Sequence, residues 1–245
     1  MAGQSEQAKT RLFVEQGLGQ GQEIALSRAH AHYLFNVLRL SRGQFVTLFN
    51  GRDGAWLAEI TQATKRGGAL VCLHQIAPQQ MPPDLWLIFA PIKKARTDFI
   101  VEKAAELGAA RIMPVQTDFT NSERIRRDRL QAHAIEAAEQ CGGTYVPPVA
   151  ELQPLSKLLS QWDSARALIF ADEALVGQGR AAATLPPPPA AILIGPEGGF
   201  SQAERARLRA LPCTHPLALG PRILRADTAA VVALSLWQAL QGDWT

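Results

Sequence analysis

The stretch ILIGPEGGF, Ile192–Phe200, decides the fold, because a short apolar run ends in a loop of three glycines, one proline and one glutamate. The apolar run has the length and composition of a buried strand in a parallel sheet. Ser201 and Glu204 follow with the S-x-x-E spacing of a capping box, which predicts a helix from about Gln202. Ligands bind at the carboxyl ends of strands in open α/β sheets, and glycines let the backbone approach them closely. The stretch therefore predicts a strand, a ligand-binding loop and a helix in succession.

The composition of this loop disfavours a phosphate ligand. Pro196 lacks an N–H group and Glu197 repels an anion, whereas a phosphate loop needs free N–H groups and a nearby Lys or Arg. A ligand with a neutral adenosine and a positively charged sulfonium, such as S-adenosylmethionine, is compatible with the loop; a tight strand-to-helix turn that binds no ligand is the alternative. The segment GQGRAA, residues 177–182, matches G-x-G-x-x-A, but its glycines begin six residues past a predicted strand end, which indicates a surface loop.

Residues 79–245 alternate between short apolar runs and helical stretches, as the strands and helices of a parallel sheet covered on both faces do. The predicted strands are 85–90, 111–115, 167–171, 191–194 and 216–219, and the predicted helices are about 98–107, 128–140 and 228–240, with a further helix from about 202. This part of the chain is therefore predicted to be an α/β domain.

Residues 1–78 have a different character. Short β-like runs at 45–49, 55–60 and 69–76 are separated by Gly-rich turns, which is typical of a small barrel or sandwich. One helix, with Ser27 as its cap and an apolar stripe that includes Leu34, interrupts them. Pro78, Pro82 and Pro83 then indicate a linker. We expect two domains, 1–78 and 79–245.

A second candidate wall for the ligand pocket lies in LALGPRILRADTAA, residues 217–230. A predicted strand ends at Gly220, a loop carries Ile223, Leu224 and Arg225, and Asp227 or Thr228 is expected to cap the last helix. Backbone groups and the aliphatic side chains would hold an adenine, and Arg225 would face the substrate. A surface ion pair between Arg225 and Asp227 is the alternative.

Cationic residues indicate where a polyanion could bind. Residues 1–78 contain eight Lys and Arg against five Asp and Glu, whereas residues 79–245 contain seventeen of each, so the whole net charge of +3 lies in the first region. Lys93, Lys94 and Arg96 cluster at a predicted strand end, where phosphate contacts would be useful. A chance excess of charge and a solvated loop are the alternatives.

The remaining sequence features exclude several classes of protein. The apolar fraction of 47% and the charged fraction of 19% are those of a globular protein, and no apolar run approaches the ~18 residues of a membrane span. Three distant cysteines form no C-x-x-C pair, the histidines have no metal-ligand spacing, and G-x-S-x-G is absent. We therefore expect a cytoplasmic protein without a structural metal, a disulfide framework or a serine-hydrolase elbow.

Several motifs together resemble the ribosomal RNA small subunit methyltransferase E family, which belongs to the SPOUT class. They occur in the family's order and span nearly the whole chain: RLF (11–13), HYLFNVLRLSRG (32–43), KKARTDFIVEKAAELG (93–108), EAAEQCGGTYVP (136–147), ILIGPEGGFS (192–201) and LALGPRILRADTA (217–229). The resemblance implies a PUA-like β-barrel that helps to grip RNA, followed by a SPOUT-type parallel sheet with a C-terminal trefoil knot. It also implies a homodimer that transfers a methyl group from S-adenosylmethionine to N3 of a uridine in 16S ribosomal RNA of the small subunit.

On this resemblance, candidate residues can be named for each role. Arg225 is the candidate cation that stabilises the N3 anion, and Glu197 is the candidate proton acceptor. The cofactor candidates are Leu193, Gly195, Glu197, Gly198, Gly199, Leu217, Leu219, Gly220, Ile223 and Leu224. The RNA-binding candidates are Arg11, His32, Arg39, Arg42, Lys93, Lys94 and Arg96.

The chain departs from the family's pattern at two places. Gly142 and Gly143 stand where the family usually has an Arg after the AEQ motif, and Asp227 stands where it usually has Glu. A role tied to that Arg is therefore in doubt, with Lys94 or Arg96 as substitutes. The alternatives are a SPOUT enzyme that acts on another RNA site or on a ribose hydroxyl, and a non-catalytic RNA-binding factor of ribosome assembly. The missing phosphate loop disfavours a nucleotide-dependent oxidoreductase.

Overall fold

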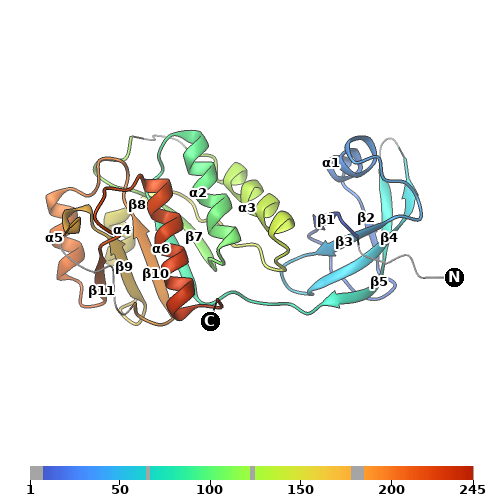
Figure 1. Cartoon of the computed structure of the whole chain (residues 1–245). Coiled ribbons are helices and arrows are strands. Elements are labelled where there is room, and N and C mark those ends of the chain that lie inside the picture. The colour runs from blue at the N-terminus through green and yellow to red at the C-terminus, as the bar shows by residue number, and fades with distance from the viewer. Residues whose placement is uncertain (1–7, 65–66, 122–124, 178–184, 245) are drawn as a thin grey trace. The chain divides into compact units, whose positions relative to one another are not determined.

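The computed structural model describes residues 8–64, 67–121, 125–177 and 185–244 (Figure 1). The chain forms two compact units: Met1–Met81 with Ala138–Val146, and Pro82–Ala137 with Pro147–Thr245. The first unit thus contains a segment that lies far beyond residue 78 in the sequence. The boundary at 78/79 stays a prediction, and the structure adds that the return segment 138–146 packs with the N-terminal strands. The loop predicted at 177–182 lies outside the described residues except for Gly177.

The first unit is built on a curled five-stranded sheet with the order β1-β3-β4-β5-β2. Its strands are β1 (Arg11–Phe13), β2 (Glu23–Ala25), β3 (Phe45–Phe49), β4 (Ala55–Ala63) and β5 (Gly68–Ala77). The pairs other than β1–β3 are antiparallel, and register shifts between β4 and β5 help to curl the sheet. The sheet forms a half-barrel with β1 and β2 as its edges. Of the two predicted alternatives, a small barrel or a sandwich, the structure is therefore nearer to the barrel.

A short helical segment covers the core of this half-barrel. Ser27 caps α1 (Arg28–Ala31) by accepting a hydrogen bond from the N–H of His30, as the sequence predicted. The chain continues as a π-helical turn, η1 (His32–Val37), which buries Leu34 among the residues of the sheet.

The second unit has a six-stranded parallel sheet with the order β11-β9-β10-β6-β7-β8. Its strands are β6 (Leu85–Phe89), β7 (Arg111–Gln116), β8 (Gln153–Pro154), β9 (Ala167–Ala171), β10 (Ala190–Ile194) and β11 (Thr214–Leu217). Its helical segments are α2 (Lys94–Glu106), α3 (Arg127–Cys141), α4 (Leu155–Ser160), the 3₁₀ turn η2 (Glu173–Leu175), α5 (Gln202–Ala210) and α6 (Ala226–Gln241). The α/β prediction is confirmed.

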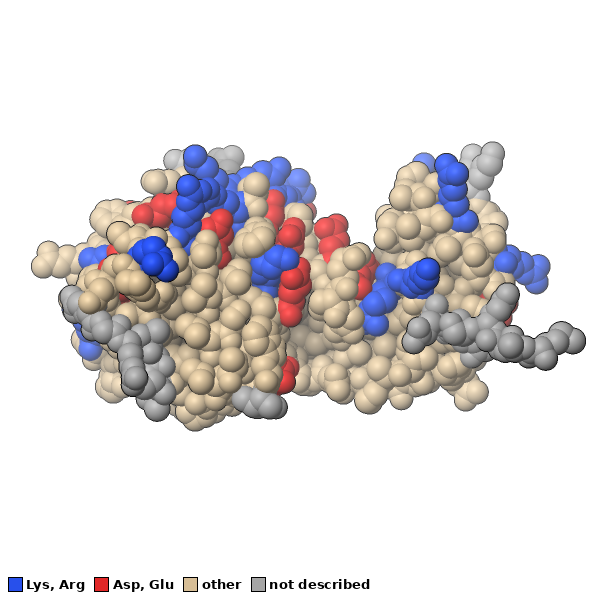
Figure 2. All heavy atoms as spheres, in the orientation of Figure 1, with Lys and Arg blue, Asp and Glu red and all other residues tan. Residues whose placement is uncertain are grey.

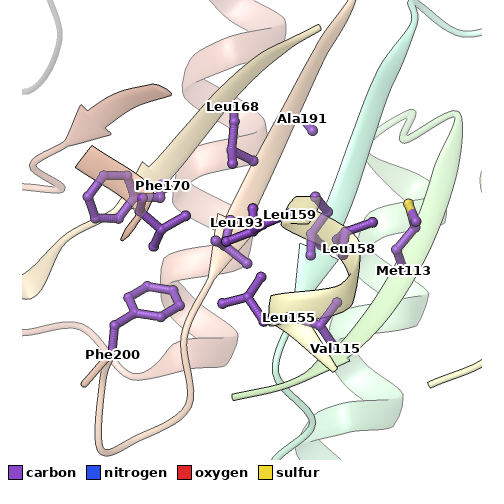
Figure 3. Packing of buried hydrophobic residues seen from close by; sticks show 12 residues of the cluster. Met113, Val115, Leu155, Leu158, Leu159, Leu168, Phe170, Ala191, Leu193 and Phe200 are labelled. Atoms are coloured by element: carbon purple, nitrogen blue, oxygen red, sulfur yellow. The ribbon is translucent and has the colours of Figure 1, made fainter. Parts of the chain in front are cut away.

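Helices cover both faces of this sheet. On one face α4 supplies Leu155, Leu158 and Leu159, which point toward the side chains of Leu193 and Val115 (Figure 3). On the other face α6 packs against β10 and α2. The sheet is therefore buried on both sides, which is why its strands are nearly continuous apolar runs.

Three predicted boundaries shift, each for a local reason. Helix α2 begins at Lys94 and not near Asp98, because Thr97 Oγ1 hydrogen-bonds both the N–H and the C=O of Ile92 and closes an earlier turn. Strand β11 ends at Leu217, where its partner β9 ends, and not at 219. Helix α6 begins at Ala226 with Arg225 at the N-cap position, so the prediction that Asp227 or Thr228 caps it is wrong. No helix in the described part of the chain is long and apolar enough to cross a bilayer.

Candidate functional site

A pocket opens at the carboxyl ends of three neighbouring strands, β9, β10 and β11, and the start of α6 forms one of its walls. Its empty volume, with the open solvent at its mouth included, is about 590 Å³. It is lined by Ala171, Asp172, Glu173, Val176, Ile194, Gly195, Pro196, Glu197, Gly199, Leu217, Leu219, Arg222, Ile223, Leu224, Ala226 and Ala229. The two sequence stretches predicted to form two walls of one pocket do come together here.

The GPEGG loop forms the first wall through a tight turn. The N–H of Gly199 donates to the carbonyl of Pro196 at 2.9 Å, and Gly199 has a φ of +69° that few other residues adopt. The predicted capping box follows: Ser201 Oγ accepts from the N–H of Glu204, and the Glu204 carboxylate accepts from the N–H of Ser201. The start of α5 therefore fixes the end of the loop.

Not every predicted residue of this wall reaches the pocket. Leu193 packs into the core with α4, and its neighbour Ile194 lines the pocket, because successive side chains of a strand point to opposite faces. Gly198 also lies outside the lining, since a Cβ built on it would contact the Cβ of Phe119 at 3.2 Å. The cofactor candidate Gly198 therefore lies outside the pocket lining.

The end of β9 supplies a wall that the sequence analysis missed. Asp172 is buried, and its carboxylate accepts hydrogen bonds from the N–H of Ala174 at 3.1 Å and from Arg209 Nη2 at 2.6 Å. Arg205 Nε lies 3.4 Å from the other side of this carboxylate, and Arg205 also pairs with Glu173. Two adjacent acidic residues at a strand end were the available signal, because acidic side chains are rarely buried without partners.

The segment between β11 and α6 forms the third wall. Leu217, Leu219 and Leu224 line the pocket, as does Ile223, whose side chain is 77% exposed. Arg222 also lies in the lining, whereas Arg225 is exposed at the N-cap of α6 outside it. Gly220 has a φ of +110° and turns the chain but does not line the pocket.

The candidate RNA-binding residues of the second unit lie at the start of α2. Lys93 and Lys94 are exposed, and Arg96 is partly buried with its Nε 3.7 Å from Asp227 Oδ2. Asp227 thus pairs with Arg96, and not with Arg225 as the alternative interpretation had it. Arg129 in α3 pairs with Asp98 in α2, so the two helices start side by side.

This placement brings further cations to the same edge. Arg126 and Arg127, at the start of α3, are exposed. Arg126 pairs with Asp128, and Arg127 Nε donates to the carbonyl of Val149 at 2.9 Å. Figure 2 shows Lys and Arg side chains gathered, with some Asp and Glu, where α2 and α3 begin. Arg126 and Arg127 were not among the predicted RNA-binding residues.

In the first unit, Arg11 differs from the other candidates. Its Nη2 donates to the carbonyl of Gly143 at 2.6 Å, and its guanidinium lies 5.0 Å from the centre of the Phe49 ring. Burial lowers the pKa of Arg11. These contacts tie β1 to the return segment 138–146, so the structure gives Arg11 an internal role and not that of a free cation for RNA.

The other three candidates of the first unit are exposed. His32 Nδ1 lies 3.0 Å from Asn36 Nδ2, Arg39 takes up a left-handed φ of +58°, and Arg42 follows in the loop before β3. Val37 and Leu38, beside them, are exposed apolar residues. In the part of the chain that the structure describes, no group of three or more His, Cys, Asp or Glu residues is arranged to hold a metal ion.

The chemistry of the pocket suits a nucleoside with a positive charge. Aliphatic side chains from three strand ends and α6 offer an apolar surface for a base. The carboxylates of Glu173 and Glu197 both belong to residues of the pocket lining and disfavour an anionic ligand. The residues present therefore fit S-adenosylmethionine better than a nucleoside phosphate.

Comparison with known proteins assigns the class of this fold and pocket. The RNA methyltransferase domain family matches residues 79–238, and the RNA methyltransferase PUA domain family matches residues 26–71. The fold and site thus place the chain in the class of SAM-dependent RNA methyltransferases with an α/β domain and a PUA-like half-barrel.

Individual relatives narrow this class. The ribosomal RNA small subunit methyltransferase E of Synechocystis is 30% identical over 89% of this chain and 73% of its own length. The solved structure of the protein of that name from Neisseria gonorrhoeae, bound to S-adenosyl methionine, matches with a TM-score of 0.87 and 28% identity, over 96% of this chain and 99% of that one. The structure of a putative methyltransferase from Legionella pneumophila, in complex with the bound cofactor SAM, matches with a TM-score of 0.85 and 30% identity, over 96% of this chain and 98% of that one. The chain belongs to the ribosomal RNA small subunit methyltransferase E family.

Proposed function

We propose that this protein methylates N3 of a uridine in 16S ribosomal RNA, with S-adenosylmethionine as the methyl donor. The observation that carries the proposal is the pocket at the carboxyl ends of β9, β10 and β11, with a glycine turn and two carboxylates on its walls. Support comes from two structural relatives, both of which are described with this cofactor bound.

Different residues of the pocket would bind different parts of the cofactor. The aliphatic side chains of Ile194, Leu217 and Leu224 would hold the adenine, and the Pro196–Gly199 turn would let the backbone lie close to the ligand. When bound, S-adenosylmethionine supplies an electrophilic methyl group on a sulfonium. The chain's own residues must then align the uracil, because displacement at a sulfonium needs orientation more than covalent help.

The N3 proton of the uracil must be lost, and two charged residues of the pocket can assist. Arg222 lies in the lining, and its guanidinium would stabilise the negative charge that spreads to the uracil oxygens. Glu197 is exposed on the opposing wall and would accept the proton. Arg225, three residues further along and outside the lining, is the alternative cation.

The exposed cations at the starts of α2 and α3 form a surface suited to RNA phosphates. We define this surface as Lys93, Lys94, Arg126 and Arg127. Positive side chains at a helix N-terminus oppose the helix dipole, and α2 has no acidic residue in its first turn. Lys93 and Lys94 therefore do not stabilise α2 through its dipole, which favours a role of these two lysines in binding phosphates.

Three further features of the proposal concern the whole molecule. A trefoil knot is proposed from membership of the family; in the structure the chain leaves β11 at the edge of the sheet and packs α6 on β10 and α2. A homodimer is proposed from membership of the family, and the exposed side chain of Ile223 in the pocket wall is one position that a second copy would cover. A cytoplasmic location follows from the proposed ribosomal substrate.

The central experiment compares Arg222→Ala with Arg225→Ala. Small subunits that lack the modification are incubated with labelled S-adenosylmethionine, and the modified base is mapped by mass spectrometry. Cofactor affinity is measured in parallel by calorimetry. We expect Arg222→Ala to lose about 100-fold or more in transfer rate while it keeps cofactor affinity, as removal of one charge-stabilising donor does. A loss of transfer rate in Arg225→Ala but not in Arg222→Ala would assign the catalytic cation to Arg225.

The same assay tests the reaction itself. Label on a base other than uridine, or on a ribose, would refute the proposed chemistry. Cofactor binding without transfer to any small subunit would favour the non-catalytic assembly factor. For the RNA surface, Lys93→Gln with Lys94→Gln should weaken RNA binding and lower its salt dependence, whereas Lys157→Gln, an exposed cation on α4, should change neither.

A further inference from the structure

Glu173 places a carboxylate on the wall of the cofactor pocket that the proposed mechanism does not use. It begins η2 directly after β9, and its side chain is 34% exposed. The carboxylate lines the pocket and pairs with Arg205 from α5. A charged group in this place needs an explanation, because an acidic side chain next to an apolar ligand surface loses hydration when the ligand binds.

A network of charges holds Glu173 in position. The adjacent Asp172, whose side chain is fully buried, is bonded by Arg209 Nη2 at 2.6 Å and lies 3.4 Å from Arg205 Nε. Arg205 and Arg209 are four residues apart on α5 and therefore lie on the same face of that helix. Arg205 contacts both carboxylates. The buried Asp172 therefore orients Arg205, and Arg205 in turn orients Glu173.

The glycine turn leaves room for this carboxylate. A Cβ built on Gly199 would overlap Glu173 Oε1, so a residue other than glycine at 199 would push the carboxylate away. The close approach brings the end of β9 against the loop that follows β10, its neighbour in the sheet. Glycine at 199 is thus needed both for its φ of +69° and for the position of Glu173.

We infer that Glu173 is a cofactor-binding residue that accepts hydrogen bonds from the ribose hydroxyls of the adenosyl group. An ionised carboxylate can only accept hydrogen bonds, so its ligand must offer donors, and the vicinal hydroxyls of a ribose offer two. An acidic residue that binds ribose beside a glycine loop is a known arrangement in dinucleotide-binding α/β folds, where the loop takes up the neighbouring part of the ligand. The inference rests on the proposed function, since it assigns one group of the same ligand.

The test uses calorimetry on the intact protein with four ligands: S-adenosylhomocysteine, its 2′-deoxy and 3′-deoxy forms, and 5′-methylthioadenosine. The variants are Glu173→Ala, Glu173→Gln and a control, Glu106→Ala. Glu106 on α2 matches Glu173 because it is 33% exposed and pairs with one cation, Lys103, but lies outside the pocket. In Glu173→Ala, Arg205 keeps its contact with Asp172, so circular dichroism should report an unchanged fold.

We expect Glu173→Ala to weaken binding of S-adenosylhomocysteine about 10- to 100-fold, the size of a lost hydrogen bond to a charged group. Glu173→Gln, which keeps one acceptor, should lose less, and Glu106→Ala should bind as the wild type does. Removing a hydroxyl should weaken binding to the wild type but cost little in Glu173→Ala, because the partner is already absent.

Three results would overturn the inference. Equal penalties for the deoxy ligands in the wild type and in Glu173→Ala would show that Glu173 does not bind the ribose. An effect of Glu173→Ala that disappears with 5′-methylthioadenosine, which keeps the ribose but lacks the amino-acid part, would assign the carboxylate to the ammonium group. Wild-type affinity in Glu173→Ala would remove it from the site. Absence of binding of any adenosyl compound to the wild type would instead refute the proposed function.

Discussion

Substitution of Gly199 by alanine tests the geometry of the pocket most directly. A left-handed backbone costs a non-glycine residue about 1–2 kcal/mol. The new Cβ must also displace the Glu173 carboxylate, which costs the partly exposed pair with Arg205 about 0.2–1 kcal/mol and an altered rotamer about 0.5–1.5 kcal/mol. We therefore expect Gly199→Ala to lower the free energy of unfolding by roughly 2–4 kcal/mol, the sum of these three contributions.

Gly177→Ala is the matched control for the backbone contribution. Gly177 has a similar φ of +79° in the same unit, but a Cβ built on it meets nothing within 4 Å. Urea unfolding followed by circular dichroism should show a loss of about 1–2 kcal/mol for this variant. In a Glu173→Ala background, the loss of stability caused by Gly199→Ala should fall to that of Gly177→Ala, because the Glu173 carboxylate no longer obstructs the new Cβ.

Two results would refute this reasoning. One is an equal loss of stability in Gly199→Ala and Gly177→Ala, which would mean that the Glu173 side chain does not obstruct a Cβ at position 199. The other is a cost of Gly199→Ala that does not change when Glu173 is already alanine. Calorimetry with S-adenosylmethionine adds an independent check, since Gly199→Ala should weaken the cofactor and Gly177→Ala should not.

Three further predictions concern stability. Ser201→Ala should cost about 1 kcal/mol in urea unfolding, because it removes the cap of α5; an unchanged midpoint would mean that the capping box contributes nothing. Leu208→Ala, on the buried face of α5, should cost about 2–5 kcal/mol, and a smaller loss would indicate that the core collapses around the cavity. The N–H of Leu18 and the amide of Asn50 lower the pKa of Asp53, so its contribution is present above the unfolded-state pKa and is lost as pH falls through the lower folded-state pKa. Asp53→Asn should flatten the acid limb of stability against pH, and an unchanged limb would refute this.

The sequence was informative wherever a local rule determines structure. The S-x-x-E spacing at Ser201 predicted both the start of α5 and its cap, and Ser27 predicted the start of α1. The apolar runs predicted five of the six strands of the parallel sheet within one or two residues, because strands buried on both faces carry few polar residues. The short strand β8 (Gln153–Pro154) has no such run and was not predicted. The glycine loop and the segment after β11 were correctly expected to share a pocket.

The sequence was less informative wherever distant segments decide. Leu193 and Ile194 are both aliphatic residues of one predicted strand, so the sequence does not distinguish them. Only the orientation of the strand in the sheet shows that Ile194 faces the pocket. The adjacent acidic residues Asp172 and Glu173 at a predicted strand end were a signal, but their pairing with Arg205, more than 30 residues further along the chain, is visible only in the structure. Arg225 was chosen for its place in the pocket loop, and only the structure shows that Arg222 lies in the lining and Arg225 outside it, because the register of the loop depends on where β11 ends and α6 begins.

The return segment 138–146 has a consequence for how the protein is made. It packs with β3 and β4 through Ala138 and Val146, and it accepts the hydrogen bond from Arg11. The N-terminal sheet therefore cannot complete its packing when residue 81 has been synthesised; it must wait until residue 146 has left the ribosome. During that interval Phe49 lacks part of its cover. A fragment ending near residue 81 should consequently be prone to aggregation, and adding residues 138–146 as a separate peptide should restore its solubility.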